Sequence, residues 1–398
     1  MAVTGLRTTY QSITTENRLV RVPDEDLLML EPKETALVSF LLGMKKKNRM
    51  IDSPRIESFE DDYMGQWITT SAQTNANAAS DTISSTDASM VVVGDLLLVP
   101  SGSSSNHEMV RVTAKPSANV CTVARNVGST GLLTIASGAG LMILGQAFEE
   151  GADSPTAKIT TLSNVTNYTQ IFKKAIELTR TDANSKHYAD SGSERQRLLT
   201  KAAKEFKIQK NLQYYWGKPS ESLTGGPSGN PIRTTGGIDH YIATNRYDVG
   251  GVMTKKTMET FARMAFRYTQ NAVLFASPLL ISAIHDWGNS FLKIGPREQV
   301  FGVDVHTVVT GHGEWKLVRD WQLRDGVSGQ NGFGGYGFSL DMDYIQERVL
   351  KGSDTAIKKD VQSNEADKHK DMIMCESGLQ IRQEKRHARI YGITDYSA

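Results

Sequence analysis

The sequence predicts an α+β protein with a small all-β domain inserted into a longer charged hairpin. Three observations predict this fold class: a long amphipathic helix in the middle of the chain, a mixed helix and strand region after it, and a group of short strands before it. The length of 398 residues allows two or three compact units. The 45 basic and 44 acidic residues nearly cancel, so the chain lacks the basic excess that is typical of proteins whose main task is binding nucleic acid.

The first 44 residues are predicted to form an extended arm that ends in a short apolar element. The early part of the arm is polar without a clear period, and the apolar runs LLML (27–30) and ALVSFLLGM (36–44) follow. An arm cannot bury these side chains by itself. They must therefore pack on the rest of the chain or on a neighbouring copy.

A charged hairpin is predicted next, formed by residues 45–71 and 156–188. Its first half contains ESFEDDYMGQW (57–67), which is acidic with interspersed aromatic residues. Residues 72–155 are predicted to form the inserted β domain. Short strands between 90 and 146 are separated by Gly, Ser, Pro and Asn clusters at roughly 8–12-residue spacing, which is typical of a small sandwich or barrel.

The clearest helix is predicted over 192–216. A capping box at its start is formed by Ser191 with Glu194, or by Ser193 with Gln196. The predicted apolar face consists of Leu198, Ala202, Phe206, Ile208, Leu212 and Tyr215. The predicted basic face consists of Arg195, Arg197, Lys201, Lys204, Lys207 and Lys210. This basic face is either a solvated surface or a docking surface for an acidic element of another copy or for packaged nucleic acid.

A mixed α+β unit is predicted after the helix, over 238–345. Its predicted elements are an amphipathic helix within 253–270, a buried strand at 272–277, a short helix with Ser277 as N-cap and Pro278 at its first position, and strands at 299–309 and 314–321. A strand pair around 371–383 and 388–394 completes the chain.

Candidate catalytic and metal-binding residues are few. The segment GFGGYG (332–337) satisfies G-x-G-x-x-G, but a dinucleotide site needs this motif directly after a strand and at the start of a helix. Here it follows a loop, so we interpret it as a loop. His306, His312 and Glu314 lie close in sequence, with Asp304 upstream, but no H-E-x-x-H motif or cysteine pair accompanies them. Exposed turn residues are the favoured interpretation.

Cys121 and Cys375 lack metal-ligand spacing and are interpreted as buried thiols. No metal or cofactor is predicted. No membrane span is expected either, because the longest apolar run, 36–44, is much shorter than the about 20 residues that a membrane helix needs. The N-terminus lacks the pattern of a secretory signal.

In its order of parts, the chain resembles the major capsid protein of tailed bacteriophages (Johnson fold), in the subgroup with a β domain inserted in the E-loop. The similar segments are EDLLMLEPKETALVSFL (25–41), VVVGDLLLV (91–99), VARNVGSTG (123–131), ILGQAFEEGA (143–152), NYTQIFKKAIELTRT (167–181) and MCESGLQIRQEKRHARIYGIT (374–394). They cover nearly the whole chain in the family's order.

This resemblance implies a set of named domains. They are an N-terminal arm (1–44), an E-loop (45–71 and 156–188), a β insertion domain (72–155), a P-domain with spine helix and G-loop (189–237 and 346–398) and an A-domain (238–345). It implies a structural protein without cofactor or enzymatic activity. Copies would form the hexamers and pentamers of an icosahedral head that encloses double-stranded DNA, in a virion assembled in the bacterial cytoplasm.

The resemblance also implies further partners: a portal, scaffold or decoration proteins, and weak non-specific contact with packaged DNA, without a membrane. We expect the contacts between copies to come from three elements. The hairpin would contribute Glu57, Glu60, Asp61 and Asp62, the spine helix Arg195, Arg197, Lys201, Lys204 and Lys207, and the arm Leu37, Phe40 and Leu41. The acidic hairpin would lie over a neighbour's spine helix, and the arm would tuck beneath an adjacent subunit. The alternatives are a tail-tube or decoration subunit, or an enzyme built on residues 238–345.

Overall fold

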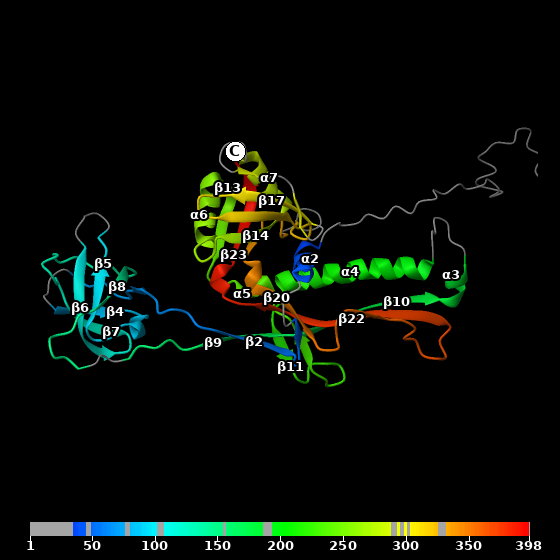
Figure 1. Ribbon diagram of the computed structural model, residues 1–398, viewed down its shortest axis with the longest axis horizontal. Coiled ribbons are helices and arrows are strands. Elements are labelled where there is room, and N and C mark those ends of the chain that lie inside the picture. Colours follow the sequence, from blue (N-terminus) through cyan, green and yellow to red (C-terminus); the bar gives the residue numbers. More distant parts are fainter. Residues whose placement is uncertain are drawn as a thin grey trace, which may run out of the picture. The chain divides into compact units, whose positions relative to one another are not determined.

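A computed structural model describes residues 35–44, 49–75, 80–101, 107–153, 157–185, 193–287, 293–294, 298–300, 303–324 and 332–397. Most of the predicted arm, including the apolar run at 27–30, lies outside these residues. The chain divides into two compact units, 1–58 with 165–398 and 59–164 (Figure 1).

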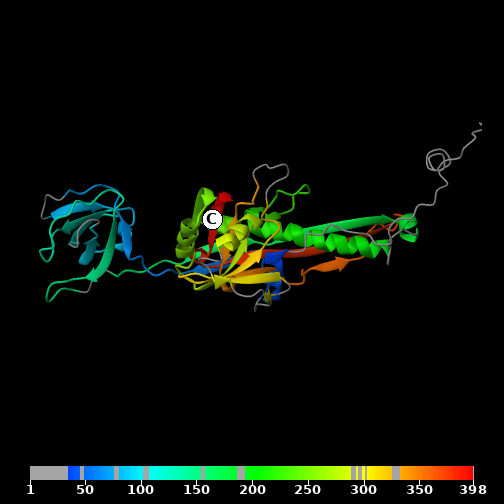
Figure 2. The ribbon, with the colours of Figure 1, turned by 90° about the horizontal axis from the view of Figure 1, so that it is seen from above.

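The first sheet of the larger unit supports the long helix α4 (Glu194–Trp216). Its strands are, in order, β1 (Met50–Ile51), β20 (Ile345–Leu350), β22 (Lys368–Ile381) and β10 (Gln170–Thr179), with β21 (Ala356–Lys358) on β22. β10 and β22 pair antiparallel from Gln170–Ser377 to Thr179–Lys368. α4 runs along these two strands (Figures 1 and 2). The short helix α3 (Arg180–Asn184) follows β10.

The second sheet of the larger unit has eight strands. They are β13 (Arg246–Met253), β23 (Ala388–Tyr396), β19 (Gly337–Leu340), β14 (Asn271–Ala276), β18 (Glu314–Arg319), β17 (Val303–Val309) and β15 (Lys293–Ile294), with β16 (Glu298–Val300) on β17. Helices α6 (Lys255–Ala265) and α7 (Pro278–Trp287) pack on it. The predicted cap of α7 is confirmed, since the Leu280 amide donates to Ser277 Oγ at 3.3 Å. The predicted mixed α+β composition is also confirmed.

The larger unit also contains short elements outside its two main sheets. They are α2 (Ala36–Gly43), β11 (Ser220–Ser222), β12 (Ile232–Thr234), α5 (Ile238–Tyr241), η3 (Met342–Tyr344) and η4 (Glu384–Arg386). β11 and β12 form an antiparallel hairpin. A further two-stranded sheet joins β2 (Arg55–Glu60) to β9 (Ser163–Tyr168), and these strands lead into and out of the smaller unit.

The long helix α4 begins two residues later than predicted. Ser193 occupies the N-cap but makes no side-chain cap hydrogen bond, and the alternative cap Ser191 lies outside the described residues. The buried face also differs from the predicted one, because Leu212 is 39% exposed whereas Leu199 is buried. The buried residues are Leu199, Ala202, Phe206, Lys210, Asn211, Tyr214 and Tyr215.

The smaller unit, 59–164, contains the predicted small β domain. Its six-stranded sheet consists of β3 (Trp67–Thr69), β8 (Gly140–Gln146), β5 (Asp95–Val99), β6 (Glu108–Ser117), β7 (Val120–Ala124) and β4 (Ser80–Ser84), and η1 (Ala88–Met90) precedes β5. The unit has its own core, which includes Ile68, Leu97, Val110 and Val123. Its Arg125 guanidinium donates two 2.6 Å hydrogen bonds to the carboxylate of Glu108, and both side chains are fully buried.

Candidate assembly surfaces

The segments at the end of the β2–β9 pair carry large apolar side chains in contact with water. Phe59 is 70% exposed, Ile159 is 84% exposed, and Tyr63 is fully exposed. Leu162 adds a further exposed apolar side chain. Large apolar side chains that are exposed in neighbouring segments are typical of a surface that takes part in contacts with another molecule.

Acidic side chains lie in the same segments as these apolar residues. Glu57, Asp61 and Asp62 are exposed, and Glu60 is partly buried. Asp61 accepts a 2.9 Å hydrogen bond from Thr160 Oγ1, and the Glu60 carbonyl accepts one of 3.2 Å from Ser163 Oγ. Glu60 and Asp61 are thus both hydrogen-bonded to the returning segment 160–163.

The base of this strand pair is attached to the β11–β12 hairpin by Glu221. Its carboxylate accepts hydrogen bonds from Arg55 Nη2 at 3.0 Å and from Arg233 Nε at 2.8 Å. These two arginines hold the pKa of Glu221 below its ordinary value, Arg233 more strongly than Arg55. The start of β2 is therefore oriented by a hairpin that lies more than a hundred residues later in the chain.

Helix α4 presents three exposed lysines, Lys201, Lys204 and Lys207. They follow one another at steps of three, so they lie along one side of the helix. Glu205 is the acidic residue among them, and its carboxylate pairs with Lys174 of β10 at 2.9 Å. The lysine row is therefore an exposed, positively charged side of α4.

The two arginines at the start of α4 already pair with carboxylates of their own chain. Arg195 Nε donates to Asp371 at 2.7 Å, and its Nη2 donates to Asp360 at 2.9 Å. Arg197 Nε donates to Glu194 at 2.7 Å. Arg195 and Arg197, which we expect at a contact between copies, thus each pair with a carboxylate of their own chain while their side chains stay 24% and 35% exposed.

Lys210, predicted on the basic face of α4, is instead buried in the subunit. Its side chain is 3% exposed and forms an ion pair with Glu347, which is 2% exposed. Glu347 also accepts hydrogen bonds from Arg49 Nη2 at 3.1 Å and from Tyr214 Oη at 3.0 Å. Burial alone would raise the pKa of Glu347, but Lys210 and Arg49 outweigh burial and lower it.

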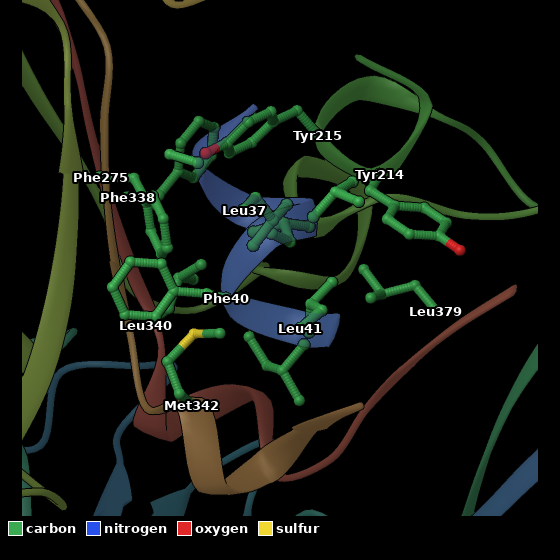
Figure 3. Packing of buried hydrophobic residues seen from close by; sticks show 14 of the residues in the cluster. Leu37, Phe40, Leu41, Tyr214, Tyr215, Phe275, Phe338, Leu340, Met342 and Leu379 are labelled. Carbon is green, nitrogen blue, oxygen red and sulfur yellow. The ribbon is translucent and has the colours of Figure 1, made fainter. Parts of the chain in front are cut away.

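The apolar residues of α2 lie in the core of their own chain (Figure 3). Leu37, Phe40 and Leu41 are 0%, 3% and 7% exposed. Phe40 packs edge-on against Phe275, with 5.7 Å between ring centroids. Leu37, Phe40 and Leu41, which we expected to lie beneath an adjacent subunit, are thus buried in the core of their own subunit.

Polar groups from distant elements hold the N-terminus of α2. The Val38 amide donates to Asn211 Oδ1 at 3.0 Å, and the Leu37 amide donates to the buried carboxylate of Asp320. The residue that precedes the helix, Thr35, makes no side-chain cap. These two bonds satisfy amides that a helix leaves without partners at its start, so the position of α2 depends on α4 and on the end of β18.

The described residues contain no group of three His, Cys, Asp or Glu side chains that could hold a metal ion. His312 Nε2 lies 2.8 Å from Glu259 and is partly exposed. The GFGGYG segment turns directly into strand β19 and opens no helix, which confirms its interpretation as a loop. Cys121 and Cys375 are buried free thiols, as predicted. In the described part of the chain, no helix is both long enough and apolar enough to span a bilayer.

Sequence reasoning missed two features of these surfaces. Ile159 and Leu162 were not singled out, because they flank two threonines in a segment whose composition is typical of an ordinary strand. The contact of Arg55 with Glu221 was also missed, because no pattern in a single sequence indicates which charged residues meet when they lie so far apart in the chain. The sequence signal that could have indicated this surface is the presence of Phe59 and Tyr63 among the acidic residues of 57–67.

Comparison with known proteins identifies the family. Residues 2–394 match the family described as SU10 major capsid protein. A protein named "Major capsid protein" from Pseudomonas phage PaMx41 is 28% identical over 213 residues, which are 50% of this chain and 48% of that protein. The match thus spans about half the length of that relative.

Solved structures of shells are also similar. The capsid of a native GTA particle aligns with a TM-score of 0.47 and 8% identity, over 96% of this chain and 99% of that chain. An SrpI encapsulin complex from Synechococcus elongatus PCC 7942 aligns with a TM-score of 0.41 and 10% identity, over 60% and 79%. Because the family match extends over almost the whole sequence, this chain belongs to the SU10 major capsid protein family.

Proposed function

We propose that copies of this chain assemble, as hexamers and pentamers, into the icosahedral head of a phage around double-stranded DNA. The observation that carries the proposal is the set of exposed apolar side chains beside acids at the β2–β9 segments, together with the family of the chain. Such a surface is stabilised only when another molecule covers it. In a shell, that molecule is the next copy of the same chain.

The contact that we propose joins the acidic residues of one copy to the lysine row of α4 in the next. Glu57, Glu60, Asp61 and Asp62 would lie over Lys201, Lys204 and Lys207. Contacts of this kind are heterologous and close into rings when their rotation allows. An exposed ion pair contributes only about 0–1 kcal/mol. Burial of Phe59, Tyr63 and Ile159, at about 25 cal/mol per Å², would therefore supply more of the free energy of association.

The remaining parts of the proposal rest on the resemblance to the major capsid proteins of tailed bacteriophages. The subunit is structural rather than enzymatic, and it resides in the virion after assembly in the bacterial cytoplasm. Its further partners are a portal and scaffold or decoration proteins. Contact with packaged DNA is weak and non-specific, which agrees with a nearly neutral chain of 45 basic and 44 acidic residues.

Electron microscopy of the expressed protein tests this function. We expect closed shells from the wild type. Replacement of Lys201, Lys204 and Lys207 by Glu should stop assembly and leave a folded subunit, because like charges then face each other across the contact. The matched control replaces three other exposed lysines, Lys256, Lys351 and Lys358, and should still form shells.

Each part of the proposal can fail separately in this experiment. Normal shells from the α4 variant would exclude the proposed contact but not the shell. Tubes from the wild type would indicate a tail-tube subunit instead, and small discrete oligomers would favour a decoration subunit or another activity.

A further inference from the structure

A polar hollow of about 890 Å³ lies beside the segment that follows α6. Three arginines, Arg267, Arg382 and Arg386, line it together with Asp341 and Asp343. Aromatic rings of Phe266, Tyr268 and Tyr344 complete much of the wall. A smaller hollow of about 340 Å³ shares Asp341 and Asp343 with the first and adds Glu314 and Lys316. Together they form a groove of mixed charge.

Arg386 has its partners within the subunit. Its Nη1 donates to Asp341 Oδ2 at 3.2 Å, and its guanidinium lies 4.1 Å from the centre of the Tyr344 ring. Asp341 is further held by Thr269 Oγ1 at 3.2 Å and by the amide of Asp343 at 3.1 Å. On this side of the hollow, Arg386 and Asp341 therefore already have hydrogen-bond partners within the subunit.

Arg382 differs from Arg386. Its guanidinium is partly buried, its Nε is buried without a hydrogen-bond partner, and no carboxylate within the described residues pairs with it. Its charged neighbour is Arg348. Burial, and then the charge of Arg382, lower the pKa of Arg348.

Several other partly or fully buried arginines among the described residues pair with an acid. Arg49 pairs with Glu347, Arg125 with Glu108, and Arg195 with Asp371. A cation taken partly out of water beside a like charge, without a carboxylate, is unfavourable in the isolated subunit. The site at Arg382 is thus incomplete in one copy.

We propose that this hollow binds a carboxylate side chain from a second copy of this chain, which pairs with Arg382. The inference rests on the proposed self-assembly and specifies one of its contacts. A guanidinium with free donors binds a carboxylate through two parallel hydrogen bonds. The nearly neutral chain, with 44 acidic residues, has carboxylates to contribute.

The lining favours protein over nucleic acid as the partner. A phosphodiester backbone in this groove would meet Asp341, Asp343 and Glu314, whereas proteins that bind DNA through its backbone neutralise phosphates with rows of Lys and Arg. Tyr, Phe and Arg are the residues that are enriched in contacts between proteins.

The test replaces Arg382 by Lys and uses zero-length cross-linking. A carbodiimide joins a lysine amine to a carboxylate as an amide, and one carboxylate oxygen leaves as part of the urea by-product. Particles are assembled from a mixture of ¹⁴N- and ¹⁵N-labelled subunits, so that mass spectrometry separates links within a copy from links between copies. We expect residue 382 to be linked to an Asp or Glu of the other isotope. Arg263→Lys, on an exposed part of α6 outside the groove, is the matched control and should give no such link.

Three results would overturn the inference. One is a link from the lysine introduced at position 382 only to Asp341 or Asp343 of the same copy. Another is the absence of any link in particles that form normally. A third is loss of packaged DNA in Arg382→Gln particles together with no link between copies in Arg382→Lys particles, which would assign the groove to phosphate. Failure of the wild type to form shells counts against the proposed function. In that case the same cross-linking between copies is measured in the oligomer that forms instead.

A second variant measures the strength of the contact. Arg382→Gln keeps a polar side chain but removes the charge. We expect particles of this variant to dissociate at lower urea concentration than wild type, with circular dichroism of the free subunit unchanged. Arg263→Gln particles should match the wild type. Equal dissociation of both variants would contradict a role for Arg382 between copies.

Discussion

Glu347 joins three parts of the larger unit through one carboxylate. Lys210 of α4, Arg49 before β1 and Tyr214 of α4 all contact it, and Glu347 itself belongs to β20. Removal of one partner leaves a buried charge without full compensation, which costs more than the loss of an exposed ion pair. These contacts fix the rotation of α4 about its own axis relative to β20.

Lys210→Met should lower the free energy of unfolding of the subunit by about 3–5 kcal/mol. The reason is that Glu347 stays buried with its main cation removed. Urea unfolding followed by circular dichroism measures the change. Lys207→Met, three residues earlier and exposed, is the control and should change the free energy by less than about 0.5 kcal/mol. If both substitutions changed the free energy of unfolding equally, the buried Lys210–Glu347 pair would contribute no more to stability than an exposed lysine.

Glu177 is the residue whose charge state should matter in acid. Hydrogen bonds from Lys368 at 2.6 Å, and from Lys370, lower the pKa of Glu177 from 4.5 to about 2. A carboxylate whose pKa is depressed in the folded state stabilises that state above its unfolded pKa. This stabilisation is lost as the pH falls from about 4.5 to about 2.

Glu177→Gln should therefore lower the melting temperature of the subunit near neutral pH. The difference from wild type should narrow as the pH falls through that range, because wild-type Glu177 then becomes neutral as well. Thermal unfolding at a series of pH values measures this. Glu365→Gln, an exposed position in the turn before β22, should give a difference that does not vary in this way. A constant difference for Glu177→Gln would contradict the assignment.

At the scale of elements, the position of α2 depends on side chains of other elements. Asn211 accepts from the Val38 amide at 3.0 Å and donates to Asp320 at 3.2 Å and to Gln322 at 2.7 Å. Its amide group thus connects the start of α2, the last two turns of α4 and the segment after β18. The helix has only eight residues, too few to be stable alone in water.

Asn211→Ala should loosen α2 before it affects the rest of the subunit. Buried groups left without hydrogen bonds cost about 1–3 kcal/mol each. We expect faster hydrogen exchange at the amides of Leu37 and Val38, with exchange in β14 unchanged. Gln209→Ala, exposed on the same helix, is the control. Unchanged protection of α2 in the Asn211 variant would show that its apolar contacts alone hold it.

The helix α4 shows how far a single sequence predicts an element. The steps between Ala202 and Phe206, and the glycine at 217, predict its existence and its end. They do not predict that Lys210 and Asn211 lie on the buried side, because the pattern counts both as polar. Their partners, Glu347 and Asp320, lie more than a hundred residues away in sequence. Periodicity therefore identifies the helix, whereas its rotation depends on distant charges.

The same limit applies to the predicted contact residues. Composition distinguishes the acidic segment 57–67 and the basic side of α4, and apart from Lys210 the charged side chains of both are at least partly exposed. It does not distinguish Arg195, which pairs with Asp371, from Lys201, which remains exposed. Nor does it show whether the apolar residues of α2 serve their own core or a neighbour's. That choice depends on the cavity that the remaining elements leave.

At the scale of the whole molecule, residues 59–164 have the features of an independent folding unit. They have their own core, and the buried pair of Arg125 with Glu108 lies inside it. The ends of the unit lie close together, since Ser163 Oγ donates to the Glu60 carbonyl at 3.2 Å. A segment whose two ends lie close together and which has its own hydrophobic core can fold without contacts from the rest of the chain.

The isolated fragment 59–164 should fold with a single cooperative transition in urea. Dispersed amide signals in a two-dimensional NMR spectrum would show the fold directly. Arg125→Met in the fragment should lower its free energy of unfolding by about 3–5 kcal/mol, because Glu108 then remains buried without its cation. A fragment that stays unfolded would show that the surrounding chain is needed.

The burial of α2 also has a consequence for the timing of synthesis. The core that receives Leu37 includes residues as late as Leu379 and Ile381. A ribosome makes about 5–20 residues per second, and domains fold as their chains emerge. Leu37 must therefore wait for nearly the whole chain before its core can close. In a nascent or truncated chain, α2 would lack the core on which it packs. Only full-length subunits would therefore have the folded surfaces that contact one another.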